Sequence, residues 1–190
     1  MKRWPGETLR KKKVPVGWIP GLLVAMAMGW EGNELLTAKN LRDNELVFPK
    51  SAAVEGIIDG DNFFIENGQS IRLIGINAPE RGKENFEEAK NRLAGLVVDK
   101  QVWLEYDRYQ DDKFGRVLAW IWIGCESDPN FLPPDYMHLN KRQSRPGLTE
   151  NPEGCKEGKS VNELMVDSGL AKVETYKDRG ELKYEARLRE

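Results

Sequence analysis

Residues 54–80 read VEGIIDGDNFFIENGQSIRLIGINAPE, and this stretch decides how the chain folds. Two short apolar runs, residues 63–65 and 71–76, flank Asn67-Gly68, a dipeptide that tolerates positive φ and favours a tight type I′ hairpin turn. The stretch therefore predicts a β-hairpin. Because acidic residues precede its first strand and another acid follows its second strand, we expect polar groups to gather where the strands end.

Three more stretches are predicted as strands, and in the last of them two sets of apolar residues alternate. The stretches are residues 52–58, 100–106 and 117–123. Five strands, with a helical pattern between the third and the fourth, favour a small closed barrel. We therefore expect a mainly β fold of the α+β class, a five-stranded OB-fold barrel with three flanking helices.

The three helices are predicted from capping residues and helical periodicity. Residues 85–98 place their apolar side chains on one face, and Asn85 can cap this helix while Glu88 completes a capping box. A second, short helix follows Ser160, and a last helix begins at Asp178. We expect the first helix to cover an open side of the sheet.

The N-terminal part of the chain differs in composition from the rest. Residues 1–13 are strongly basic, and residues 14–30 form an uncharged apolar run. This order is typical of a signal peptide or an N-terminal membrane anchor, and a buried core helix is the alternative. We expect an extracytoplasmic protein, either secreted or attached to the membrane through residues 14–30. Residues 31–51 then form a linker and residues 52–190 the folded domain.

The net charge of −2 conceals an asymmetry between the basic N-terminal segment and the acidic remainder of the 190 residues. The whole chain contains 39% hydrophobic residues and is long enough to bury a core as one domain. An acidic domain does not bind nucleic acid through its overall charge, so a polyanion would need a local basic cleft.

Two cysteines, Cys125 and Cys155, lie near the ends of a stretch without periodicity, residues 124–159. This stretch is rich in Pro, Gly and charge, and we interpret it as a surface insertion. Export would place the cysteines in an oxidising compartment, where we expect a disulfide; two free thiols are the alternative.

The predicted barrel brings together polar groups that suit phosphodiester chemistry. Carboxylate and amide oxygens, such as those of Asp61 and Asn77, suit a hard cation such as calcium or magnesium. Arg72 and Arg116 match the charge and the bidentate geometry of a phosphate, and Glu80 can orient or deprotonate water.

Each group also has a simpler interpretation. Residues 59–62 can form an ordinary turn, and residues 112–116 an ordinary hairpin connection. Arg72 is harder to explain in this way, because it interrupts an apolar strand and needs a partner on the opposite face of the sheet. The joint occurrence of these groups favours a functional site.

Three motifs carry a resemblance to a known family. IDGD followed by IRLIGINAPE, then DDKFGRVLAW, then VNELMVDSGLAKV, have an order and spacing that resemble the staphylococcal (micrococcal) nuclease family of thermonucleases. The resemblance covers the chain from residue 52 onward, apart from the insertion. It implies an OB barrel and an endonuclease, a phosphodiesterase that hydrolyses DNA and RNA with calcium.

The resemblance also implies a role for each matching residue. Arg72 and Arg116 would contact the scissile phosphate, and Glu80 would act on the attacking water. The implied metal site consists of Asp61, Asn77 and the backbone carbonyl of Ala78, with Asp59 behind them. The implied substrate-binding residues are Lys113, Phe114 and Tyr176.

One departure from the family concerns the metal. The family usually has an aspartate where this chain has Asn77, so calcium affinity should fall because ligand charge helps to set it. The cofactor is then Ca²⁺, with Mg²⁺, or no metal in a degenerate site, as alternatives. We expect a monomer that acts on DNA or RNA.

Two other functions remain open. The first is a catalytically weakened OB-fold module that binds nucleic acid or a protein partner. The second is a barrel that serves as a scaffold while the insertion binds a partner. The insertion residues considered for this role are Tyr136, Met137 and His138, for which loop packing is the simpler interpretation.

Overall fold

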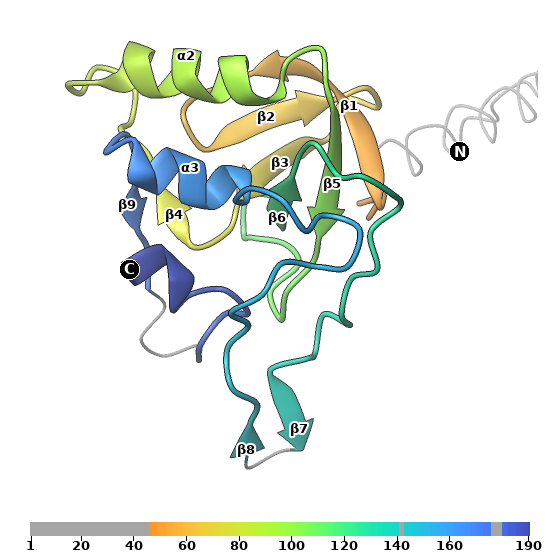
Figure 1. The fold of residues 1–190 in the computed structure, drawn as a ribbon. Helices are drawn as coiled ribbons and strands as arrows, with labels where there is room; N and C mark the ends of the chain where they lie inside the picture. The colour runs from red at the N-terminus through yellow and green to blue at the C-terminus, as the bar shows by residue number, and fades with distance from the viewer. Residues whose placement is uncertain (1–45, 141–142, 176–179) are drawn as a thin grey trace, which may run out of the picture. The chain divides into compact units, whose positions relative to one another are not determined.

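A computed structural model describes residues 46–140, 143–175 and 180–190, within the compact unit Leu46–Glu190. A closed barrel with the strand order β1-β2-β3-β6-β5 forms the centre of this unit (Figure 1). The strands are β1 (Ser51–Ile57), β2 (Asn62–Ile65), β3 (Ser70–Leu73), β5 (Gln101–Glu105) and β6 (Val117–Trp122). The predicted five-stranded, mainly β barrel is confirmed.

The barrel is a mixed sheet. β3 and β6 run parallel, whereas the other neighbouring strands pair antiparallel. All six residues of β6 are buried. The outward rings of Trp120 and Trp122 are covered by Tyr184 from the end of the chain, at centroid distances of 5.2 and 5.4 Å.

The turn between β2 and β3 differs from the predicted type I′ turn. The backbone N–H of Gly68 donates to Ile65 at 2.8 Å, and that of Ile65 donates to Gln69 at 3.1 Å, which closes a three-residue loop. Gly68 has a φ of 78°, whereas Asn67 has no positive φ. A type I′ turn needs positive φ at both central residues, so the hairpin is confirmed but its predicted turn type is wrong.

The helix α2 (Phe86–Val97) lies across one end of the barrel (Figure 1). Its buried face consists of the apolar residues whose period predicted it: Phe86, Ala89, Leu93, Leu96 and Val97. The capping prediction is wrong, because Asn85 takes a left-handed conformation with a φ of 63° and its side chain caps nothing. In α3 (Val161–Asp167), by contrast, Ser160 and Glu163 form a complete capping box.

The predicted last helix is not found in the described residues 180–190. They form a turn and then the short 3₁₀ helix η2 (Arg187–Arg189). Four successive residues, 182–185, are buried. A surface helix would expose part of such a run, so packing of this segment on all sides overrides its helical pattern. Among residues 46–140, 143–175 and 180–190, the helices are therefore α2, α3 and the 3₁₀ turn η2, in place of the three predicted flanking helices.

The third predicted strand, residues 71–76, is divided in two. β3 ends at Leu73, and Gly75 turns the chain with a φ of 78°. The chain then continues as β4 (Ile76–Asn77), which pairs with β9 (Lys172–Val173) in a separate two-stranded sheet. This small sheet brings residues 76–77 next to a segment almost 100 positions later in the chain.

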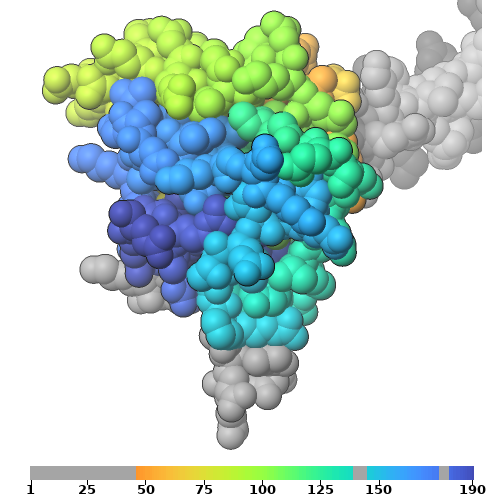
Figure 2. Space-filling model, viewed as in Figure 1, coloured from red at the N-terminus to blue at the C-terminus, as the bar shows by residue number. Residues whose placement is uncertain are grey.

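The insertion contains little regular structure. Its β7 (His138–Asn140) and β8 (Gln143–Ser144) form a hairpin that projects away from the barrel (Figure 1). Other parts of the insertion lie against the domain, below α2 on the face seen in Figure 2. The predicted disulfide between Cys125 and Cys155 is present.

The predicted signal peptide or anchor, residues 1–30, and most of the predicted linker lie outside the described residues. Across residues 46–140, 143–175 and 180–190, no helix is both long enough and apolar enough to cross a membrane.

Candidate active site

Three neighbouring strands bring the predicted phosphate-binding residues together. Asn62, at the start of β2, lies opposite Arg72 on β3, and Arg72 lies opposite Leu118 on β6. Arg116 immediately precedes β6. The two arginines, which are 44 positions apart in the sequence, are therefore placed on adjacent strands by the parallel β3–β6 pairing.

The IDGD motif is more than a surface turn. The backbone N–H groups of Ile58 and Asp59 donate to the carbonyl of Asn62, which closes the connection between β1 and β2. A Cβ atom on Gly60 would lie 2.6 Å from Ala89 and 2.7 Å from Ala78, so only glycine fits where the turn packs on α2 and on the exit from β4. This packing carries the next residue, Asp61, into the interior, where it is 2% exposed.

The carboxylate of Asp61 accepts three short hydrogen bonds. One oxygen accepts from the Arg72 guanidinium and from the Asn62 amide, each at 2.6 Å, and the other accepts from the Ala78 backbone N–H at 2.6 Å. Burial raises the pKa of Asp61 to about 7, although the Arg72 charge and the Ala78 N–H act in the opposite direction. Asp61 therefore binds a proton more readily than an exposed aspartate does.

Arg116 is held by two side chains. Its Nε and Nη2 donate to Asp112 Oδ2 at 2.7 and 2.6 Å, and its Nη1 donates to Asn62 Oδ1 at 3.1 Å. Partial burial raises the pKa of Asp112, but hydrogen bonds from the Arg116 side chain and backbone outweigh this effect, so the pKa lies below its usual value. Asp112 is thus ionised at neutral pH and orients Arg116 as a charged pair.

Arg72 has a second set of contacts on its other terminal nitrogen. Its Nη2 donates to Asn77 Oδ1 at 3.1 Å and lies 3.4 Å from Glu174 Oε2. The Arg72 side chain is 10% exposed, whereas that of Glu174 is 36% exposed. One guanidinium therefore joins β3 to the small β4–β9 sheet and to the buried carboxylate of Asp61.

Of the remaining predicted residues, the structure describes Asp59, Glu80, Lys113 and Phe114. Glu80 is exposed two residues after the buried Ala78, and Asp59 accepts from the Asn62 amide at 2.8 and 3.0 Å. Phe114 is 70% exposed and lies on the same loop as Arg116, whose guanidinium carbon is 5.2 Å from the centre of its ring. Lys113 stands 4.9 Å from the same ring. Tyr176 lies outside the described residues.

Three residues of the cluster were not predicted as members of the site: Asn62, Asp112 and Glu174. Asn62 directly follows the IDGD motif, and Asp112 lies in DDKFGRVLAW four positions before Arg116, so their local contacts were open to prediction. Glu174 gives no such signal, because its contact with Arg72 spans 102 positions and depends on the β4–β9 pairing.

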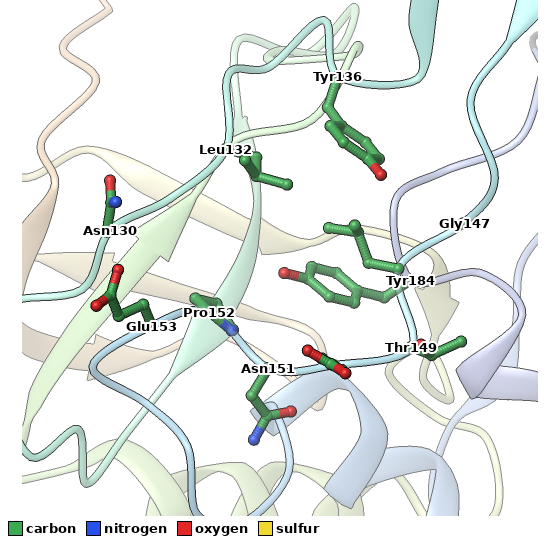
Figure 3. Close-up of a pocket in the computed structure, with 11 residues that line it drawn as sticks. Asn130, Leu132, Tyr136, Gly147, Thr149, Asn151, Pro152, Glu153 and Tyr184 are labelled. Atoms are coloured by element: carbon green, nitrogen blue, oxygen red, sulfur yellow. The ribbon is translucent and has the colours of Figure 1, made fainter.

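The insertion forms a cavity of about 410 Å³ whose lining contains none of these residues. In Figure 3, Asn130 and Glu153 lie at one end of it and Tyr136 at the other, with Tyr184 between them. Met137 is buried and therefore packs in the interior. In the described part of the chain, His138 belongs to no group of three His, Cys, Asp or Glu residues that could hold a metal.

A closed, mixed five-stranded barrel thus brings two arginines together with the buried carboxylate of Asp61. Comparison with known proteins assigns its family. Residues 70–190 match the family described as staphylococcal nuclease homologue, and the chain belongs to this family.

Individual relatives agree with this assignment. The chain is 40% identical over 86 residues to a thermonuclease of Staphylococcus intermedius, an alignment that covers 40% of this chain and 51% of the relative. It is 34% identical over 79 residues to a thermonuclease of Staphylococcus hyicus, with coverage of 37% and 47%. An uncharacterized endonuclease of Escherichia coli is 28% identical over 94 residues, with coverage of 48% and 54%. The chain spans about half the length of these relatives.

Proposed function

We propose that this protein is a calcium-dependent nuclease that hydrolyses phosphodiester bonds in DNA or RNA. One observation carries the proposal: Asn62 joins Arg116 to the Asp61 carboxylate, which itself pairs with Arg72. Two guanidinium groups and a buried acid thus form one connected cluster on adjacent strands.

The chain's own residues suit the steps of phosphodiester hydrolysis. Arg72 and Arg116 bind the phosphate and stabilise the charge that builds up on its oxygens. Glu80, an exposed carboxylate two residues after Ala78, accepts a proton from the attacking water. The exposed ring of Phe114 offers a nucleotide base a stacking surface, and Lys113 adds a positive charge next to it.

The donor atoms near Asp61 fit calcium. Within the described ranges, no group of three or more His, Cys, Asp or Glu residues could hold a metal. A mixed set does fit, because the Asp61 carboxylate, the Asn77 amide and the Ala78 backbone carbonyl all offer the oxygen atoms that calcium prefers. When bound, calcium would polarise the phosphate and offset its negative charge.

Plasmid degradation by the purified full-length chain tests this function. We expect cleavage in millimolar calcium and none in EDTA. The variant Arg72→Ala should lose at least about 100-fold in rate, because charge stabilisation by such groups is worth that much. A chain that is folded by circular dichroism but does not cleave DNA or RNA in calcium would overturn the proposal.

A binding module is the second candidate, and the contacts of Arg72 favour it. This guanidinium is already paired with Asp61, Asn77 and Glu174 and also donates to the Ile76 carbonyl, so a phosphate must compete with these partners for it. In a binding module, Arg72→Ala should leave the affinity for its ligand largely intact. Fluorescence anisotropy with labelled single-stranded DNA separates the two functions when it is measured alongside cleavage.

We further propose that the protein is exported, as a secreted or membrane-anchored monomer. The disulfide between Cys125 and Cys155 supports this location, because such bonds persist in oxidising compartments. N-terminal sequencing of the mature protein and its distribution between membrane and soluble fractions test the proposal. Recovery of the full-length chain in the cytosol, with both thiols reduced, would contradict it.

A further inference from the structure

Arg72 marks the place where three side-chain oxygens from distant parts of the chain meet. Nη1 of this residue contacts Asp61 at 2.6 Å, while Nη2 contacts Asn77 at 3.1 Å and Glu174 at 3.4 Å. Two of the three groups are carboxylates, and the third is a neutral amide. Oxygens gathered around one positive charge form the kind of donor set that a hard cation also uses.

The β4–β9 pairing fixes Glu174 beside Asn77. Asn77 lies directly opposite Lys172, and Ile76 lies opposite Val173. The backbone N–H of Glu174 then donates to Gly75 at 2.8 Å, which extends the pairing by one residue. Since side chains two positions apart on a strand point to the same face, Glu174 and Asn77 are diagonal neighbours on one face of this small sheet.

The position of Glu174 bears on the charge of the site. Residue 77 is a neutral amide, so β4 contributes no carboxylate to this set. Glu174 brings a carboxylate to the same guanidinium nitrogen that Asn77 contacts. Two carboxylates therefore lie around Arg72, that of Asp61 and that of Glu174, which directly follows β9.

We propose that Glu174 supplies the cation site with the carboxylate that residue 77 lacks. The ligands are then Asp61, Asn77, the Ala78 backbone carbonyl and Glu174. This inference rests on the calcium dependence proposed above. It assigns a function to Glu174, which lies outside the three motifs by which the chain resembles its family.

Calcium affinity measured without substrate tests the assignment. Isothermal titration calorimetry of the full-length chain should show that Glu174→Gln weakens calcium binding by at least about tenfold, because ligand charge sets the affinity of hard-cation sites. The matched control is Glu66→Gln, which removes an exposed acid from the β2–β3 turn and should leave the affinity unchanged. Equal calcium affinities for Glu174→Gln and the wild type would overturn the inference while leaving the nuclease intact.

A swap of the carboxylate gives the stricter test. Asn77→Asp alone should tighten calcium binding, and the double variant Asn77→Asp/Glu174→Gln should return to within about threefold of the wild type, because the acid count is restored. A residue that only holds Arg72 in place would give no such rescue, and this result would also overturn the inference. Absence of calcium binding by the wild type, with or without cleavage, would overturn both the calcium dependence and the role of Glu174.

Discussion

Asn62 accepts a hydrogen bond from Arg116 through its amide oxygen, at 3.1 Å, while its amide nitrogen donates to Asp59 and Asp61. This one side chain connects the second arginine to the acidic turn. Removal of the Asn62 side chain should leave the barrel intact, because the backbone pairing of Asn62 with Arg72 does not depend on that side chain.

We therefore expect Asn62→Ala to lower kcat for DNA cleavage by about 10- to 100-fold, since displacement of a catalytic group by an ångström costs this much. Asn67→Ala, in the exposed turn of the same hairpin, is the control and should retain the wild-type rate. An Asn62→Ala variant with unchanged kcat would show that Arg116 is positioned by Asp112 alone.

Asp61 should make the stability of the metal-free protein depend on pH. Burial raises its pKa from 3.8 to about 7, so the folded chain holds a proton that the unfolded chain releases between these values. The free energy of unfolding should therefore fall as pH rises from about 4 to about 7, because the folded state binds more protons over this range.

Urea unfolding in EDTA at pH 5 and pH 8 measures this effect. The asparagine in Asp61→Asn cannot ionise. The free energy of unfolding of this variant should therefore fall less from pH 5 to pH 8 than that of the wild type. Glu66→Gln should keep the wild-type dependence. The same pH dependence in Asp61→Asn and the wild type would place the titrating group elsewhere.

The disulfide should contribute to stability more than to catalysis. Cys125 and Cys155 are 30 positions apart, and closing a loop of this length stabilises the fold by about 3–4 kcal/mol on the chain-entropy model. The double variant Cys125→Ala/Cys155→Ala should lose about this much free energy of unfolding in urea while keeping its kcat at 20 °C. A loss of less than about 1 kcal/mol would mean that the insertion restrains the unfolded chain little.

The barrel could be predicted from the sequence because its strands carry their own signal. The alternation of Val102 and Leu104 with polar or partly exposed neighbours is a local property, and so is the apolar face of α2. The turn at Asn67 and the cap at Asn85 were predicted wrongly, because dipeptide and capping preferences describe what a residue can do. The surrounding loop decides which of these conformations is used.

The candidate site divides in the same way. Asp61, Arg72 and Arg116 could be recognised from motifs, and the sheet brings them together. Glu174 could not, because strands of two residues have no detectable period and their pairing joins positions almost 100 apart. The last predicted helix failed for a related reason: residues 182–185 make their contacts with the barrel, and these contacts are absent from the local sequence.

Lys183 provides the strongest of these contacts. Its side chain is fully buried, and Nζ donates to Glu105 at 3.0 Å and to the backbone carbonyls of Tyr106 and Leu132 at 2.7 Å each. It thereby ties the C-terminal segment to β5 and to the insertion. Burial raises the pKa of Glu105, while the Lys183 charge opposes this rise, so loss of the lysine should raise this pKa further.

We expect Lys183→Met to lower the free energy of unfolding by about 3–5 kcal/mol at pH 8, because it leaves a buried carboxylate without its counter-charge. The loss should be smaller at pH 5, where Glu105 of the variant can take up a proton that the unfolded chain holds less tightly. Lys183→Met/Glu105→Gln should recover part of the loss, and Lys156→Met, at an exposed site, should cost little. Urea unfolding gives the free energy of unfolding of the wild type and of these three variants. Unchanged stability of Lys183→Met would show that the C-terminal segment does not depend on this ion pair.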